Sequence, residues 1–182
     1  KEGYIVNQGN ERLQGFQTDA DNNITSSVDD LQVSTAPISP QSSSTINLQM
    51  NLDSNSAEIS SPFSVADPSG TSNFSAGITT FDSLGNSHLV TIYFRKTTTD
   101  RLWSWHAVVD SSEITSASTD TVCATGTLRF STSGALQSAA TTSSDFDFIN
   151  AAQNQSITFD FGTVGDTDGF TQFGNDSAVT NI

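Results

Sequence analysis

Two histidines, His88 and His106, are the side chains of this 182-residue chain best suited to general acid–base chemistry. Imidazole titrates near neutral pH and activates a hydroxyl or thiol when an orienting carboxylate stands beside it. His88 follows a predicted turn, and His106 alternates out of phase with the apolar residues around it. Neither has a Ser, Cys or carboxylate at a spacing typical of a catalytic triad. We therefore expect structural or solvated histidines and no catalytic residue.

Paired carboxylates offer a second kind of chemistry, glycoside hydrolysis, which spacing in the sequence alone does not exclude. The tidiest pair is Asp145 and Asp147, but these residues alternate with Phe146 and Phe148 in a plain strand-like segment. A secreted hydrolase would need its carboxylates to converge in a cleft, which only coordinates reveal. With no glycine-rich phosphate loop and no cluster of metal ligands, we expect neither an enzyme nor a cofactor.

A third group of residues is similar to the opening of a calcium-binding loop, with Asp19, Asp21 and Asn23 at alternate positions. Ile24 stands where such a loop needs Gly for its sharp turn, and no bidentate Glu closes the site. Residues 166–169, Asp-Thr-Asp-Gly, repeat the idea in a shorter form. Both segments favour Asx-turns, in which the side chain binds its own backbone, over a metal site.

Two tryptophans, Trp103 and Trp105, share one face of a predicted strand with Ala107 and Val109. Aromatic rings at this spacing can form a platform on which a sugar stacks. The same face is more often core, because each ring removes about 150–250 Å² from water. Core is therefore the favoured interpretation, and an extracellular carbohydrate-binding or adhesin module is the alternative function.

Composition limits the class of protein and its partners. The 20 acidic residues against 6 basic ones give a formal net charge of -14, which disfavours nucleic acid and anionic membranes as partners. Roughly three positions in ten are Ser or Thr, far above ordinary usage, which suits an extracellular β-protein. The single cysteine, Cys123, allows no internal disulfide, and the apolar runs are too short for membrane insertion as a helix.

The elements that must position these residues are strands. The clearest is 46–52, where four apolar residues alternate strictly with polar ones, as in a strand with one buried face. Residues 17–45 and 111–126 are expected to be irregular, and 145–153 has room for a single helical turn. The fold class is therefore all-β. The expected strands are 4–6, 13–16, 46–52, 74–81, 88–96, 102–109, 127–131, 135–138 and 156–161.

Several motifs resemble those of the bacterial flagellar hook protein family. The first is a hairpin, GYIVN at 3–7 with RLQGF at 12–16, in which Phe16 replaces the more usual Tyr. The most specific is TFDSLGNSH at 80–88, which continues into TIYFRK and then the two tryptophans. The other matching blocks are NLQMNL at 47–52, PFS at 62–64 and FTQFG at 170–174.

The resemblance implies two tandem β-domains, of which the inner one is discontinuous. Residues 1–52 would form its first segment and 163–182 its return segment, with a barrel- or sandwich-like outer domain inserted at 53–162. The composition shifts towards Pro, Asn and Gly near residue 53 and towards Gly and Asp near residue 165, where such crossings would lie. The family's terminal helices are missing here, so we interpret the chain as an outer, β-rich fragment.

The resemblance further implies a structural subunit of the hook, the flexible joint that transmits torque from the motor to the filament. Such subunits leave the cell through the flagellar secretion apparatus, lie outside the cell and self-assemble into a helical tube. Their implied partners are further copies, rod proteins, hook–filament junction proteins and the hook cap. Some members crosslink a Cys to a neighbouring Lys, for which Cys123 with Lys96 or Lys1 would be candidates, although a buried inert thiol is the favoured alternative.

Overall fold

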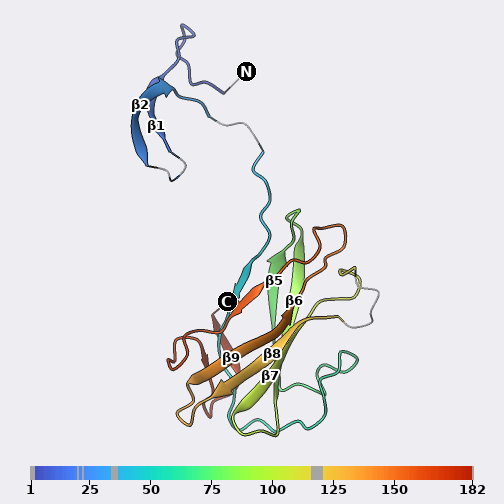
Figure 1. Ribbon diagram of the computed structural model, residues 1–182. Coiled ribbons are helices and arrows are strands. Elements are labelled where there is room, and N and C mark those ends of the chain that lie inside the picture. The colour runs from blue at the N-terminus through green and yellow to red at the C-terminus, as the bar shows by residue number, and fades with distance from the viewer. Residues whose placement is uncertain (1–2, 20, 22, 34–36, 116–120, 182) are drawn as a thin grey trace. The chain divides into compact units, whose positions relative to one another are not determined.

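The computed structural model describes residues 3–19, 21, 23–33, 37–115 and 121–181. These residues form strands, turns and bends (Figure 1), and none of them belongs to a helix long and apolar enough to cross a membrane. The chain divides into two compact units, Lys1–Ser39 and Pro40–Ile182. The all-β fold class expected from the sequence is confirmed.

The first unit is a small antiparallel hairpin of β1 (Gln14–Thr18) and β2 (Ile24–Asp30). An isolated bridge between Val6 and Arg12 extends it, and a turn joins the two bridged residues. The positive φ of that turn belongs to Asn10, at 63°, and not to the neighbouring Gly9. Asn tolerates this left-handed conformation because its short side chain bonds locally.

The strand β2 corrects one expectation, because the sequence predicted irregular structure for residues 17–45. Its seven residues, Ile-Thr-Ser-Ser-Val-Asp-Asp, are mostly polar and mostly exposed, so they carry little alternation. The segment is extended because its backbone pairs with β1, with Phe16 opposite Val28 and Gln14 opposite Asp30. Backbone pairing needs no apolar pattern, and this strand was therefore invisible to a search for one.

The second unit is built on a five-stranded antiparallel sheet in which each strand pairs with its neighbours in sequence order, as seen in Figure 1. Short hairpin turns connect three of the four strand pairs, so the sheet is a simple meander. The five strands are β5 (Phe74–Phe81), β6 (Ser87–Lys96), β7 (Leu102–Val108), β8 (Val122–Phe130) and β9 (Leu136–Ser144).

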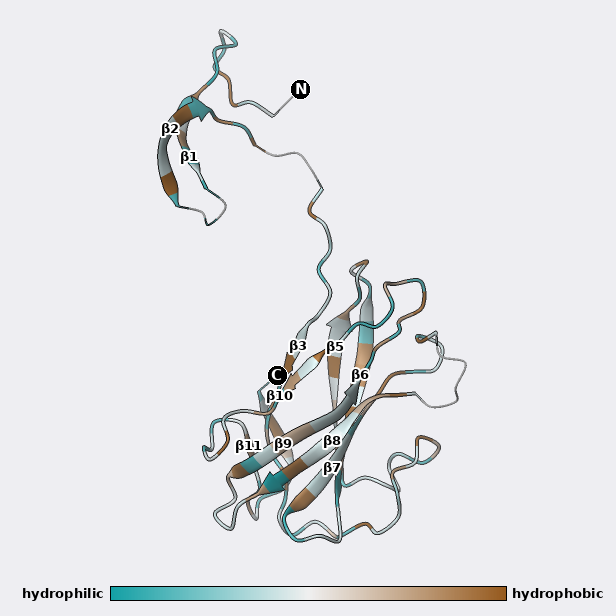
Figure 2. Cartoon of the chain, in the orientation of Figure 1, coloured by the Kyte–Doolittle hydropathy of each residue, from teal (hydrophilic) through white to brown (hydrophobic). Residues whose placement is uncertain are grey.

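The first three strands lie where the sequence predicts them. Buried and exposed residues alternate along β5 and most of β6, so one face of the sheet is the core face. Figure 2 shows the same contrast, with apolar bands on the strands and mostly polar loops. The turn between β8 and β9 also matches, because Gly134 adopts a φ of 83° and donates its N–H to Ser131 O.

Shorter strands pack beside this sheet. The predicted strand 46–52 divides into two pieces, yet its four apolar residues are buried as expected, with Leu52 at 0% exposure. The first piece pairs with β10 in parallel, and the second lies between β11 and β12. The strands are β3 (Thr45–Asn47), β4 (Gln49–Asn51), β10 (Thr158–Asp160), β11 (Phe170–Thr171) and β12 (Ala178–Asn181).

One aromatic cluster joins the short strands to the large sheet. The ring of Trp105 lies 4.7 Å from Phe159 and 5.2 Å from Phe161, measured between centroids. Phe161 in turn meets Phe170 edge to face at 5.1 Å. Rings at these separations stabilise the core beyond the area that they bury. The second unit therefore has a single hydrophobic core, to which residues on either side of position 53 contribute.

Three further segments differ from the interpretation of the sequence. Residues 122–126 belong to β8 and are not irregular, and 178–181 form a strand that no pattern predicted. Residues 145–153 contain bridges and turns in place of a helical turn. The boundary between the two compact units follows Ser39, so residues 40–52 belong to the second unit. The assignment of 1–52 and 163–182 to an inner domain and of 53–162 to an outer domain stays a prediction.

Candidate functional site

His88 lies at the centre of a small polar cluster at one end of the large sheet. Its Nδ1 is 2.7 Å from Glu113 Oε2, and its Nε2 is 3.2 Å from Asp82 Oδ2. The ring stacks on Phe148 at a centroid distance of 3.9 Å. With a carboxylate at each nitrogen, both nitrogens donate only when the ring is an imidazolium. The cluster joins three separate loops, which is a structural arrangement.

Asp82 is the fully buried member of this cluster, with no exposed surface. Its carboxylate accepts hydrogen bonds from the backbone of Leu84 at 2.8 Å and of Asn86 at 2.9 Å, and from the Asn86 side chain at 2.9 Å. Burial by itself would raise the pKa of Asp82, but the hydrogen bonds from Asn86, His88 and Leu84 outweigh it and hold the pKa well below its ordinary value. The carboxylate therefore fixes the β5–β6 turn.

His106 lies apart from this cluster, on the outward face of β7. Its ring stacks almost parallel on Phe63, with centroids 4.3 Å apart and an interplanar angle of 7°. Its Nδ1 is 3.2 Å from the hydroxyl of Thr125 on the next strand. The contact ties the loop before β5 to the sheet, as expected of a structural histidine. The prediction that no residue is catalytic stays a prediction.

The two tryptophans point into the core. Trp103 and Trp105 are both 0% exposed, and so is Ala107 on the same face of β7. The prediction of a core face is confirmed, whereas a sugar-stacking platform is wrong for this chain. A platform needs a ring open to solvent, and these rings pack against Phe159 and other core residues instead.

Each of the two acidic motifs forms local hydrogen bonds. Asp19 Oδ1 accepts the backbone N–H groups of Asp21 and Asn23, both at 2.9 Å, which is the predicted Asx-turn. Asp168 accepts two hydrogen bonds from Thr163 in a similar local arrangement. Within the described part of the chain, no three His, Cys, Asp or Glu residues lie close enough together to hold a metal ion.

Asp145 and Asp147, the pair considered for glycoside hydrolysis, make separate contacts. Asp145 is exposed, and its backbone N–H donates to Cys123 O at 2.9 Å. Asp147 Oδ1 accepts the N–H of Asn154 at 2.6 Å and so fixes a loop. Asp147 therefore has a local structural role, whereas the contact of Asp145 is made by its backbone.

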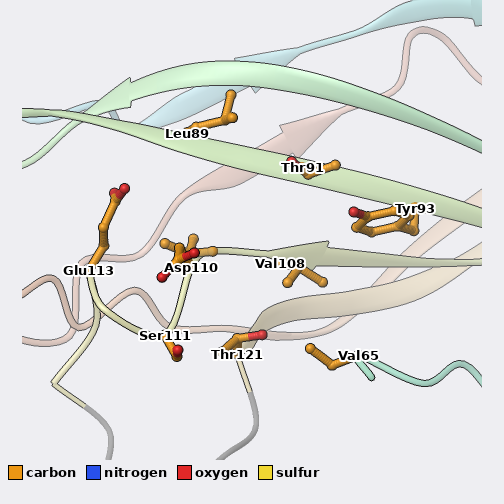
Figure 3. A pocket seen from close by; sticks show the side chains of 10 residues that line it. Val65, Leu89, Thr91, Tyr93, Val108, Asp110, Ser111, Glu113 and Thr121 are labelled. Carbon is orange, nitrogen blue, oxygen red and sulfur yellow. The ribbon is translucent and has the colours of Figure 1, made fainter. Parts of the chain in front are cut away.

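A depression of the second unit, shown in Figure 3, has a volume of about 460 Å³. Its floor is the outward face of β6 and β7, with Leu89, Tyr93 and Val108, and Val65 stands at one side. Glu113 lies at the rim, where it bonds His88. The lining is mixed, and neither histidine belongs to it. Such a mixed lining is typical of a protein surface and gives no sign of a reactive site.

The residues considered for a crosslink are both engaged within the chain. Cys123 is buried at 8% exposure, with its Sγ 3.7 Å from Thr121 O. The ammonium group of Lys96 donates to the carbonyls of Ser54 at 2.6 Å and of Ser56 at 2.9 Å. Lys1 lies outside the described residues. The buried thiol of Cys123, and Lys96 with its hydrogen bonds to the loop after β4, therefore suit structural roles.

Comparison with known families decides what these features belong to. The model of the flagellar basal body protein FlaE D2 domain matches residues 51–182, which is most of the chain and includes the whole five-stranded sheet. The chain belongs to the FlaE D2 domain family. The resemblance to the flagellar hook family that the sequence motifs indicated is thereby confirmed for this region. The first hairpin motif lies before the matched residues.

Curated relatives agree with the FlaE D2 assignment. Two flagellar hook proteins FlgE, from Salmonella typhimurium and Salmonella typhi, are each 34% identical over 122 residues, or 66% of this chain. The chain spans 29% of the length of each relative. Among solved structures, a 32 kDa fragment of the flagellar hook protein FlgE from Caulobacter crescentus is 16% identical with a TM-score of 0.49, covering 60% of this chain and 45% of the fragment.

Sequence reasoning missed the partners of His88 in this FlaE D2 domain. Asp82 is only six residues away, and its spacing to Asn86 is a signal for a closed Asx-turn. Glu113 lies 25 positions away, on a segment that no pattern connected to the turn. Only the fold brings these residues together, because the connection after β7 returns towards the start of β6.

Proposed function

We propose that this chain is part of a structural subunit of the bacterial flagellar hook, the flexible tube that transmits torque from the motor to the filament. The observation that carries the proposal is the FlaE D2 match over residues 51–182. The location follows from it: the hook and basal body, outside the cell, after export by the flagellar secretion apparatus. Its partners are further copies of the same protein, together with rod, junction and cap proteins.

The first unit supports a role inside a larger assembly. Phe16, Ile24 and Val28 are 62%, 77% and 54% exposed on a two-stranded hairpin. A hairpin with so little buried surface is marginally stable by itself. We assign this hairpin to the inner domain of a longer protein, where these apolar side chains would pack against other segments of that domain.

The proposed role is mechanical, and the polar surface of the chain suits a tube that bends. The strand β9 exposes a run of Ser, Thr, Ala and Gln between positions 137 and 143. Hydroxyl and amide groups exchange partners and bridging waters at little net cost, so contacts between outer domains can slide as the tube turns. An assembled hook in which outer domains met through fixed, water-free apolar contacts would contradict this mechanism.

Immunogold electron microscopy tests the function. Antibodies raised against this chain would be applied to isolated hook–basal bodies of the source bacterium, with a strain that lacks the gene as the control. We expect gold along the curved hook segment. Label confined to the filament, or to the cell surface away from flagella, would overturn the proposal.

The assembly state of the chain alone is a second expectation. Because copies of net charge -14 repel one another, we expect a monomer at micromolar concentration. Multi-angle light scattering measures the mass directly. A stable oligomer of the isolated chain would show that its own surfaces suffice for assembly, contrary to this expectation.

A further inference from the structure

The five-stranded sheet is free of acidic side chains, although the chain as a whole is strongly acidic. The strands β5 to β9 contain no Asp or Glu, whereas the chain contains 20 such residues. The acidic residues of the second unit that the structure describes lie in loops and short strands instead. A surface without carboxylates is where two acidic copies approach with the least repulsion.

Part of this acid-free surface is already covered. Phe63 stacks on His106, and Arg95 donates to Ser61 O and to the hydroxyl of Ser104. The loop before β5 therefore lies against the outward side of β6 and β7. These contacts leave three strands outside the covered part, β5 at one edge and the adjacent pair β8 and β9 at the other.

We name one side of the strands β8 and β9 the β8–β9 face: Thr127, Arg129, Ser138 and Ala140, which the register places together opposite the buried Leu128. Thr127, Ser138 and Ala140 are exposed, and Arg129 is half-buried. The strand β9 is also the last in the sheet. Exposed, uncharged edge strands readily accept another chain.

Arg129 gives this face its charge. Within the described part of the chain it has no ion-pair partner, whereas the neighbouring Arg101 is neutralised by Asp100 at 2.5 Å. Asp145 is exposed and lies beside Cys123, near the start of β8. Six residues of strand separate Cys123 from Arg129, or roughly 20 Å at the rise of a β-strand. Arg129 and Asp145 of one molecule therefore cannot meet.

We propose that the β8–β9 face is a docking surface for a second copy of this chain, with Arg129 of one copy facing Asp145 of the next. Copies aligned in the same direction would repeat this contact head-to-tail without closing, whereas two antiparallel copies would satisfy both ion pairs and close into a dimer. The proposal takes the parallel arrangement, which a row of subunits requires. The inference rests on the proposed function in taking a second copy as the partner. The opposite charges of Arg129 and Asp145 and the absence of carboxylates from the face support it.

The experiment measures weak self-association of the isolated chain at 150 mM salt, by sedimentation equilibrium and by ¹⁵N chemical-shift changes as unlabelled chain is added up to millimolar concentration. We expect shifts at β8, β9 and the residues after β9. Arg129→Gln and Asp145→Asn should each weaken association about two- to fivefold, the range of an exposed ion pair. Matched controls are Gln41→Glu and Asp176→Asn, which change the net charge equally at exposed positions elsewhere.

The sign of the effect separates a specific contact from general repulsion. Asp145→Asn and Asp176→Asn both reduce the net negative charge, so general repulsion predicts tighter association for both. The docking model predicts weaker association for Asp145→Asn alone. A mixture of Arg129→Glu and Asp145→Lys chains should associate more tightly than either variant by itself.

Several results would overturn the proposal: no shifts at millimolar concentration, shifts away from the β8–β9 face, or equal effects of Asp145→Asn and its control. Shifts on β9 that persist unchanged in Arg129→Gln would indicate edge-to-edge pairing of two β9 strands instead. Circular dichroism of each variant shows whether the fold is intact. Antibody labelling of hooks tests the proposed function independently of this contact. Failure of the contact would therefore not contradict the proposed function.

Discussion

Replacing Asp82 by Ala removes the carboxylate that organises the β5–β6 turn. Four hydrogen bonds are lost, from Leu84 N, Asn86 N, Asn86 Nδ2 and His88 Nε2. The carboxylate has no exposed surface, so water cannot easily replace it for these donors. Removing one partner of a buried charged cluster costs about 3–5 kcal/mol, because the remaining groups keep their desolvation cost without a partner.

The assay is urea unfolding followed by tryptophan emission, since Trp103 and Trp105 report directly on the core. The matched control is Asp110→Ala. Asp110 also accepts two hydrogen bonds from the residue two positions on, Ser112, but it lies in solvent. We expect a fall in the free energy of unfolding of about 3–5 kcal/mol for Asp82→Ala and a much smaller fall for the control. Equal losses in the two variants would refute the argument from burial.

Three further predictions concern the same core and turn. Asp82 should contribute no pH dependence to the free energy of unfolding above its ordinary pKa of 3.8. The free energy of unfolding should fall as the pH drops below 3.8 towards the lowered folded pKa, because the unfolded chain then binds protons more tightly. Acid titration of Asp82→Asn should lack this fall, and an unchanged slope would contradict the prediction. Gly126→Ala should lower the free energy of unfolding by about 1–3 kcal/mol, because a Cβ there would overlap Ala140 O. The control Gly77→Ala should have little effect, because its Cβ would meet Leu89 at an ordinary 3.4 Å. Similar melting temperatures for the two variants would count against the packing argument. Tryptophan emission of the native chain should be blue-shifted and resistant to iodide quenching, and red-shifted emission that changes with added glycans would return the adhesin alternative.

Much of the large sheet could be predicted from the sequence. Strands such as β5 and β6 have one face in the core and one in solvent, so the period of two is written into their residue types. The same reasoning placed Trp103, Trp105 and the apolar residues of 46–52 in the core. The β8–β9 turn was predictable because Gly134 adopts the required positive φ without strain.

Other elements could not be predicted in this way. The hairpin signal predicted only the start of β9, at 135–138; the rest of β9 is exposed on both faces and β12 is exposed throughout, so neither has an apolar period. Each is a strand because its backbone bonds a neighbour, and every residue type except Pro can make such bonds. The polar strand β2 was missed for the same reason.

The amino-acid sequence by itself therefore determined the all-β class, the buried face of the main strands and the family, since these depend on residue types at short, regular spacing. The tertiary structure alone decided which polar groups meet. Asp82 and Glu113 reach His88 from two loops, and Arg129 is separated from Asp145 by the length of β8. Such contacts depend on strand order and register, which are set by the summed packing of the whole core and leave no local pattern in the chain.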